Sequence, residues 1–253
     1  MSCPKLVAHR GYATQFPENT LCALEEAIQA GACFVEFDIQ LCADGTPVLF
    51  HDSLLKRTTG KEGNLLDLNY ETIKDLEAAE CERFGKRFVN RGIHIPRLDE
   101  AVTLLRSAPQ LTAFVEIKTE SLDRHGIGPV LETVLGVLRP VTGQWVIISY
   151  SAAALEAARR LSAERIGWVL STWSDESRAT ATQLLPDFLI CNHEKIPTDL
   201  TPLWPGPWQW CFYEVTNPVL ALTLHARGAD LIETMDIGAM LADIRLTDGG
   251  RFD

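Results

Sequence analysis

Acidic and histidine side chains gather around one short stretch of the sequence, residues 34–52. Glu36 and Asp38 lie two residues apart in an apolar run, and His51 follows them after an Asp-Gly turn. Residues two apart on a β-strand project from the same face, so the two carboxylates would stand side by side on a face that should be apolar. Burying two like charges is costly unless a cation compensates them. The stretch therefore indicates a metal-binding site with a proton-transferring histidine beside it.

Two other segments carry groups that would complete such a site. His9 and Arg10 follow the first apolar run of the chain, and Glu116 and Lys118 repeat the spacing of two at the end of another. Three carboxylates favour a hard divalent cation, Mg²⁺ or Ca²⁺, whereas a soft metal would require more Cys or His ligands. Taken singly, each acid is equally well explained as an ion-paired or surface residue. The set together indicates a site.

The basic and histidine side chains of this set suggest which reaction the site performs. Arg10 and Lys118 supply the positive charge that an anionic substrate such as a phosphate needs. Histidine is the side chain whose ordinary pKa lies near neutral pH, so His9 and His51 are the candidates for the acid and the base that displacement at phosphorus requires. The sequence does not assign the acid and the base between the two histidines.

Strands and helices are expected to alternate along the chain. Eight strand-helix units close most naturally as an α/β fold of the (β/α)8 TIM barrel type, with functional residues at the C-terminal strand ends. A doubly wound open sheet is the alternative, but no GxGxxG turn follows the first strand. We expect strands at 5–8, 33–41, 112–118, 145–150, 166–171, 188–191, 209–215 and 230–234, helices at 20–30, 98–107, 129–138, 152–161, 176–185, 218–227 and 237–244, and a short helical turn around 198–204.

Residues 53–97 interrupt this alternation, because they are polar, irregular and rich in charge. We interpret them as a small insertion after strand two, placed on the barrel rim within a single domain that covers residues 1–253. Lys56, Arg57 and Lys61 in this insertion are expected to form a solvated face, although they could also attract an acidic substrate.

Other aromatic and histidine residues are expected to have structural roles. Trp208, Trp210 and Tyr213 on the seventh strand are predicted to fill the barrel, with a substrate-contacting wall as the alternative. His225 is predicted to be a surface or capping residue near the end of a helix.

Charge and composition exclude several classes of partner. The 253 residues carry a net charge of −11 and no basic cluster, which argues against nucleic acid and against an anionic membrane surface. No secretory signal begins the sequence, and no apolar run approaches the ~20 residues of a membrane span. Seven cysteines without a CxxC pair indicate free thiols and a cytoplasmic location. The oligomeric state stays open.

The motifs together resemble the glycerophosphodiester phosphodiesterase family. The matching pieces, in the family's order and spacing, are HRG at 9–11, PENT at 17–20, ExD at 36–38, HD at 51–52, IPRLDEAV at 95–102 and EIK at 116–118. The resemblance implies a (β/α)8 barrel that hydrolyses glycerophosphodiesters to sn-glycerol 3-phosphate and an alcohol. It also implies roles for the residues singled out above: Glu36, Asp38 and Glu116 as metal ligands, His9 and His51 as the catalytic acid–base pair, and Arg10 and Lys118 as phosphate contacts.

The C-terminal quarter departs from the family pattern. Tyr213-Glu214-Val215-Thr216 stands where the family often has an aromatic-Thr-Val-Asn sequence, and Thr234-Met235 where it often has Thr-Asp. These changes leave the preferred headgroup alcohol open. Alternatives are a phospholipase D-like enzyme acting on lysophospholipids, a catalytically silent binding barrel, and a metal-dependent enolising enzyme. The first would need an apolar mouth, the second the loss of a site residue, and the third acids on later strands.

Overall fold

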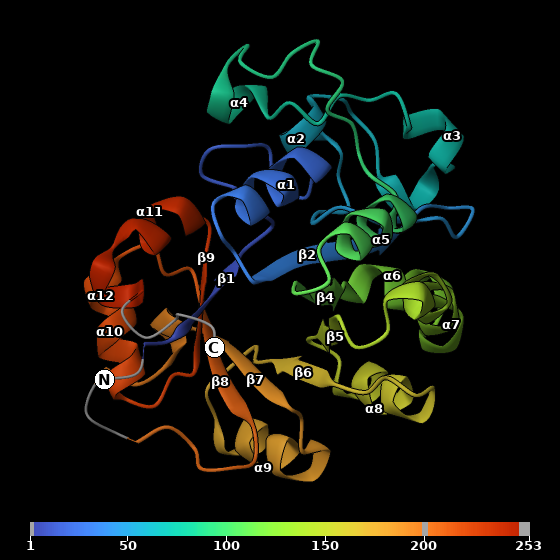
Figure 1. The fold of residues 1–253 in the computed structure, drawn as a ribbon. Helices are drawn as coiled ribbons and strands as arrows, with labels where there is room; N and C mark the ends of the chain where they lie inside the picture. Colours follow the sequence, from blue (N-terminus) through green and yellow to red (C-terminus); the bar gives the residue numbers. More distant parts are fainter. Residues whose placement is uncertain (1–2, 199–201, 248–253) are drawn as a thin grey trace.

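Eight parallel strands close into a barrel in the computed structural model, which describes residues 3–198 and 202–247 (Figure 1). This confirms the predicted (β/α)8 TIM barrel. Each strand is hydrogen-bonded to the next in the order β1 (Lys5–Ala8), β2 (Phe34–Leu41), β4 (Thr112–Ile117), β5 (Trp145–Ser149), β6 (Ile166–Val169), β7 (Phe188–Asn192), β8 (Gln209–Tyr213) and β9 (Leu231–Thr234), and β9 pairs back with β1.

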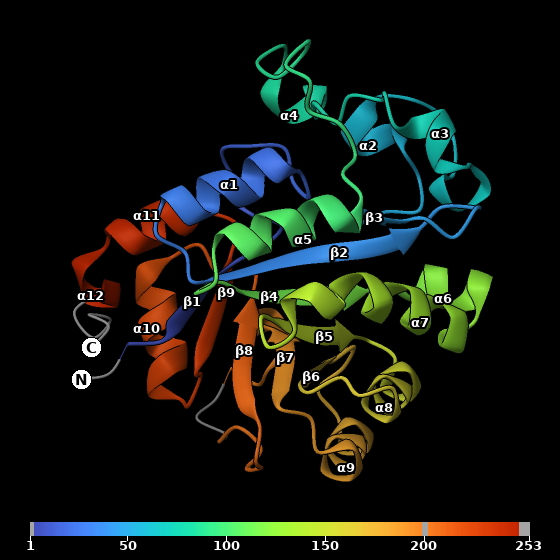
Figure 2. The same cartoon turned by 45° about the vertical axis from the view of Figure 1, so that its right-hand side comes forward.

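Helices cover the outside of the barrel and bury their apolar faces against it. They are α1 (Leu21–Gln29), α5 (Leu98–Ser107), α6 (Thr119–His125), α7 (Ile127–Leu138), α8 (Ala152–Arg160), α9 (Asp175–Leu184), α10 (Pro218–Ala226), α11 (Ile237–Ala242) and α12 (Ile244–Thr247), with 3₁₀ turns η2 (Arg139–Val141) and η3 (His193–Lys195). Figure 2 shows α1, α5 and α7 side by side along the barrel wall. None of the helices in the described residues is long and apolar enough to span a bilayer.

Three helix predictions differ from the structure. The helix α6 was not predicted. It begins directly after Lys118 and precedes the helix predicted at 129–138. The predicted helix 237–244 is two helices, because Asp243 adopts an extended conformation (φ −80°, ψ 113°) between them. The predicted helical turn around 198–204 lies partly outside the described residues, and 202–204 are not helical.

The inside of the barrel changes from apolar to polar along its axis. Phe114 of β4 and Leu231 of β9 belong to a buried apolar cluster inside the barrel. Glu116 and Glu233 follow two residues later on the same strands, so they face the same interior nearer the C-terminal ends. The barrel therefore has a dry base and a polar mouth.

The inserted segment 53–97 packs around a small apolar cluster separate from the barrel core, which its irregular sequence does not reveal. Its elements are α2 (Lys56–Thr59), η1 (Leu65–Asp67), α3 (Tyr70–Ile73) and α4 (Cys81–Phe84), and it follows β3 (Pro47–Leu49), which pairs antiparallel with β2. Figure 2 shows α2 and α3 near the C-terminal end of β2. The buried cluster consists of Leu55, Leu65, Leu66, Ile73, Ala78 and Ile95 of the insertion together with Cys42, Val48 and Phe50, which precede it.

The turn after β1 depends on a glycine. Arg10 and Gly11 both have positive φ angles, 55° and 81°. A Cβ atom on Gly11 would lie 2.5 Å from the carbonyl carbon of Ala23, because the turn packs directly on the backbone of α1. The same packing lets the Tyr12 amide donate to the Ala23 carbonyl at 2.9 Å. The turn is therefore held against α1 and fixes His9 and Arg10 at the barrel mouth.

We expect Gly11→Ala to lower the free energy of unfolding by at least about 3 kcal/mol, because it combines an unfavourable φ with a backbone clash. Gly45→Ala is a matched control: its φ is 79°, but nothing lies within 4 Å of the added carbon. That variant should lose only about 1–2 kcal/mol. Urea unfolding of both variants measures the difference, and equal losses would contradict the role assigned to the clash.

Candidate active site

A cavity of about 280 Å³ lies at the C-terminal ends of the barrel strands, where the interior is polar. Five of the seven predicted site residues line it, and the other two, Glu36 and Asp38, are buried beside them with 1% of their surface exposed. The structure thus brings the whole predicted set together. The lining residues are His9, Arg10, His51, Glu116, Lys118, Ile148, Tyr150, Val169, Ile190, Tyr213, Glu214 and Glu233.

The strand β2 presents its carboxylates as the alternation of its sequence predicts. Val35 and Phe37 belong to the core beneath the helices, so Glu36 and Asp38 face the barrel interior. The neighbouring strand β4 runs parallel to it and places Glu116 opposite Asp38. One oxygen from each of these three carboxylates lies within 4.8 Å of the others.

Two basic side chains pair with this carboxylate trio. The Lys118 Nζ atom lies 2.8 Å from Glu116 Oε1 and 3.3 Å from Asp38 Oδ1. The Arg10 Nε atom lies 3.2 Å from Asp38 Oδ2. Burial raises the pKa of the Asp38 carboxyl, but Arg10 and Lys118 outweigh burial and hold that pKa well below its usual range. Asp38 is therefore the member of the trio that stays ionised most readily.

In the remaining two acids of the trio, burial outweighs the nearby positive charges. Burial, reinforced by the Asp38 carboxylate, raises the pKa of Glu36 well above its ordinary value and the pKa of Glu116 to about 7. The Glu36 Oε1 atom is buried without a hydrogen-bond partner. Hard cations bind carboxylate oxygen atoms, and an oxygen that has no hydrogen-bond partner among other carboxylates is available as such a ligand. The residues present therefore fit a divalent cation such as Mg²⁺ or Ca²⁺.

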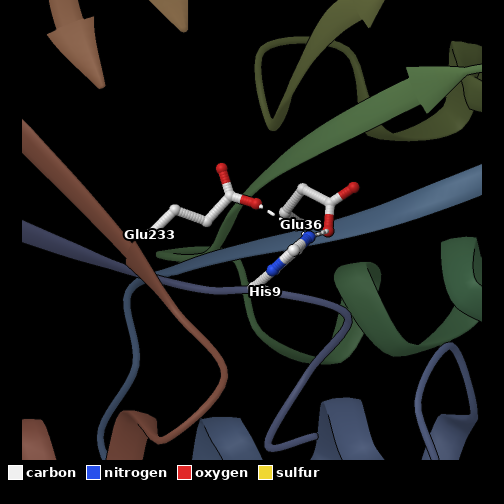
Figure 3. A group of neighbouring side chains, drawn as sticks. All are labelled: His9, Glu36 and Glu233. Carbon is white, nitrogen blue, oxygen red and sulfur yellow. Dashed lines mark ion pairs between the residues drawn. The ribbon is translucent and has the colours of Figure 1, made fainter. Parts of the chain in front are cut away.

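His9 lies between two buried acids, as Figure 3 shows. Its Nε2 atom is 3.3 Å from Glu233 Oε1 and 3.8 Å from Glu36 Oε2. Burial, together with the nearby Arg10 charge, lowers the pKa of His9 to about 3, so the ring is neutral at pH 7. Ligand atoms of His9, Glu36 and Glu233 also lie within 4.8 Å of one another, which gives a second arrangement able to hold a cation.

His51 reaches the cavity from the segment after β3. Its Nδ1 atom lies 2.6 Å from the Oδ1 atom of Asp52, and its side chain is 32% exposed. The contact with Asp52 leaves Nε2 as the ring nitrogen that is available to a substrate. The two histidines thus stand in different surroundings, one buried between acids and one half-exposed beside a single carboxylate.

Glu233 is a site residue that our sequence interpretation missed. It is 4% exposed, and burial with the Glu116 charge raises its pKa well above the usual value. The available signal was a lone acid inside the short apolar strand β9, which is unusual for a buried strand. The sequence alone does not show that this acid belongs to the site, because Glu233 comes close to His9 only through the pairing of β9 with β1.

The aromatic prediction for the seventh barrel strand was wrong. Trp208 and Trp210 pack in the core beneath the helices, outside the barrel. Tyr213 lines the cavity instead, and its hydroxyl lies 2.8 Å from that of Tyr150. The next residue, Glu214, has a positive φ of 65° and also lines the cavity, so this departure from the family pattern lies on the site wall.

Asn19 ties the loop before α1 to the carboxylate trio. Its Nδ2 atom donates to Asp38 Oδ2 at 2.8 Å, and its Oδ1 atom accepts from the Asp38 amide at 3.0 Å. Asn19 is 3% exposed and has a φ of 54°, which asparagine tolerates better than most residues. Thr20 caps the helix by accepting from the Ala23 amide.

We expect Asn19→Ala to destabilise the fold by about 3 kcal/mol, because it removes two buried hydrogen bonds at a left-handed position. Asn90→Ala is the matched control, since Asn90 has a φ of 57° but is exposed. The control should lose about 1 kcal/mol. Thermal unfolding of the two variants measures the gap, and an equal loss would show that the contacts with Asp38 contribute nothing.

Comparison with known sequences places this site in a family. The family described as Glycerophosphoryl diester phosphodiesterase family matches residues 9–191. Glycerophosphodiester phosphodiesterase 1 of Mus musculus is 43% identical over 113 residues, which are 44% of this chain and 33% of that protein. Glycerophosphodiester phosphodiesterase of Caldanaerobacter subterraneus subsp. tengcongensis is 40% identical over 114 residues, 45% of each chain. The matches thus span a third to under half of these relatives.

A solved structure agrees with these matches over nearly the whole fold. A phosphodiesterase from Oleispira antarctica, in complex with the product sn-glycerol-3-phosphate, superposes with a TM-score of 0.83 at 25% identity and covers 96% of this chain and 97% of its own. The motifs that carry the site, from HRG at 9–11 to EIK at 116–118, all lie within the matched residues. The chain therefore belongs to the glycerophosphoryl diester phosphodiesterase family.

Proposed function

We propose that this chain is a phosphoric diester hydrolase that cleaves glycerophosphodiesters to sn-glycerol 3-phosphate and an alcohol, with a divalent metal ion. The observation that carries the proposal is the barrel mouth, where two basic side chains, two histidines and Glu116 line one cavity and Glu36 and Asp38 lie buried beside it. Family membership and the product complex of the Oleispira relative support it. Every residue that the reaction needs is present, which argues against a silent binding barrel.

The substrate phosphate would bind where the basic and acidic groups meet. Arg10 and Lys118 would hold two of its oxygens, Arg10 as a planar fork and Lys118 as a point charge. Glu36, Asp38 and Glu116 would hold the metal ion, which would polarise a phosphoryl oxygen and offset the charge that develops on it. The net charge of −11 on the chain repels anions, so this local positive pair has to supply the attraction.

The two histidines would move the protons. One removes a proton from the nucleophile, which is water or the neighbouring hydroxyl of the glycerol, and the other protonates the leaving alkoxide. If the glycerol hydroxyl attacks, the product is a cyclic phosphate, and a second displacement by water opens it to sn-glycerol 3-phosphate. The bond from Nδ1 of His51 to Asp52 fixes the orientation of that ring. His9 is neutral in its buried position and has its Nε2 atom beside Glu233. Both arrangements suit proton transfer, and both assignments of acid and base stay open.

The surroundings of His51 favour a polar headgroup over an acyl chain. A second cavity of about 450 Å³ shares His51 with the first. Its walls come mainly from charged residues of the insertion and of α6, and Leu54 is the apolar exception. A lysophospholipid would need an apolar wall here, so we rank it below small glycerophosphodiesters.

The free cysteines, all seven of which lie in the described residues, support the proposed cytoplasmic location.

The first test combines turnover with metal binding. Glycerophosphocholine, glycerophosphoethanolamine and lysophosphatidylcholine are incubated with the protein and Mg²⁺, Ca²⁺ or EDTA, and release of the headgroup alcohol is measured, together with its co-product, sn-glycerol 3-phosphate from the first two substrates and lysophosphatidate from the third. We expect release from the first two and none in EDTA. At a metal concentration 100 times the Kd, the fold should gain about 2.7 kcal/mol of stability, and Glu36→Gln should lose most of that gain. Full turnover in EDTA would refute the metal ion.

The second test separates the histidines from the metal site. We expect His51→Ala to lower kcat by about 10²–10⁴-fold, because a general acid or base is lost, while stabilisation by metal persists. His94→Ala is the control, since His94 belongs to a different cavity, beside α1. That variant should keep the kcat of the unaltered protein. Full activity of His51→Ala would rule out its role in proton transfer.

A further inference from the structure

A buried carboxylate next to the site joins the barrel to the insertion. Glu18 has 3% of its side chain exposed and lies in the loop before α1. Its Oε1 atom accepts from Arg10 Nη1 at 2.9 Å and from Arg57 Nη2 at 2.7 Å. Arg10 belongs to the barrel mouth and Arg57 to the helix α2 of the insertion. One oxygen atom thus connects a phosphate-binding residue with the inserted segment.

Arg57 continues this connection to His51. Its Nε atom donates to Asp52 Oδ2 at 2.6 Å, while the other oxygen of Asp52 lies 2.6 Å from His51 Nδ1. The guanidinium group therefore bridges two carboxylates, Asp52 through Nε and Glu18 through Nη2. Burial raises the pKa of Asp52, but the bonds from Arg57 and His51 hold it below the usual value, so Asp52 stays ionised and accepts from both.

The inserted segment holds α2 in place by separate contacts. The Glu80 amide donates to the Thr58 carbonyl at 2.9 Å, and a Glu80 carboxylate oxygen accepts from the Glu18 amide. Glu80 itself is 1% exposed. Arg57 is thus anchored on both sides, by Glu18 and by the fold of α2, and its position is not that of a freely solvated surface residue.

We propose that Arg57 is a positioning residue for His51, acting through Asp52, and that Glu18 fixes the positions of Arg57 and Arg10 relative to each other by binding both. This inference rests on the proposed function and deepens it. It corrects the expectation that Arg57 belongs to a solvated face of the insertion. The orientation of the proton-transferring ring then depends on the inserted segment, even though that segment adds no proposed metal ligand.

The test compares Arg57 with its neighbour in the same cavity wall. Lys56 carries the same charge but pairs with Glu62 on the surface, 63% exposed, so Lys56→Ala controls for simple attraction of an anionic substrate. We expect Arg57→Ala to lower kcat by about 10–100-fold with less than about threefold change in KM. Arg57→Lys keeps the charge but lacks the fork and should be similarly impaired. Lys56→Ala should leave kcat unchanged, because Lys56 contacts neither Asp52 nor His51, and since it lines the proposed headgroup cavity any effect should appear in KM alone.

A double-variant cycle shows whether the effect passes through Asp52. In an Asp52→Asn background, removing Arg57 should lower kcat by less than about threefold, because the carboxylate that links Arg57 to His51 is already absent. Additive losses, a rise in KM alone, or equal effects of Lys56→Ala and Arg57→Ala would overturn the positioning role. Thermal midpoints of each variant, with Arg57→Lys as the milder change, identify losses caused by unfolding.

Ring ¹⁵N spectra give an answer that does not depend on turnover. The His51 signals, assigned by their loss in His51→Ala, should show one tautomer in the unaltered protein and a mixture in Arg57→Ala, with no change in Lys56→Ala. An unchanged tautomer in Arg57→Ala would overturn the inference. Absence of hydrolysis by the unaltered protein would contradict the proposed function instead, and the spectra would still decide the role of Arg57.

Discussion

The structure depends on how the barrel mouth accommodates four carboxylates, of which three are buried and Glu116 is half-buried. Glu36, Asp38, Glu116 and Glu233 face one interior. If all are ionised, Arg10 and Lys118 leave a net charge of −2 among these six groups, because His9 is neutral. A divalent cation carries the charge that would balance it. Without one, some of the acids take up protons, as the raised pKa values of Glu36, Glu116 and Glu233 indicate.

The rest of the fold keeps these charges in place against their repulsion. Parallel strands fix the spacing of the acids, and the apolar cluster at the base of the barrel stabilises the strands from below. A loop residue, Asn19, holds Asp38 from the side. Such an arrangement lowers stability locally in order to keep polar groups oriented, which is a common property of functional sites.

The sequence predicts the barrel and most of its mouth because both follow a simple period. Apolar and acidic residues alternate along β2, and charged residues two positions apart, Glu116 and Lys118, appear again at the end of β4. Asp38 and Glu116 could therefore be predicted to face the same interior. Glu233 has no such pattern, since β9 spans only four residues and acquires its partner through ring closure. Trp208 and Trp210 were wrongly assigned to the barrel interior because alternation predicts which residues share a face but not which face points inward.

The insertion was predictable in position but not in role. Its polar composition marks residues 53–97 as different from the barrel, whereas its core comes from apolar residues at irregular spacing that no helix or strand period reveals. The contacts of Arg57 with Glu18 and Asp52 join segments that are distant in sequence. Local patterns contain no information about such pairs, so only the folded chain shows them.

The pairing of β1 with β9 also governs the order in which the site can form during folding. The His9 amide donates to the Thr234 carbonyl, and Val7 lies opposite Glu233, so the first and the last barrel strands must meet before His9 has its surroundings. Contacts between such distant segments form slowly, because the entropy of closing a long loop opposes them. While a ribosome is still producing β9, β1 has an open edge and the acids of β2 lack Glu233 as a neighbour. Closure of the ring is then the step that assembles the site, and a chain that stops short of β9 would lack it.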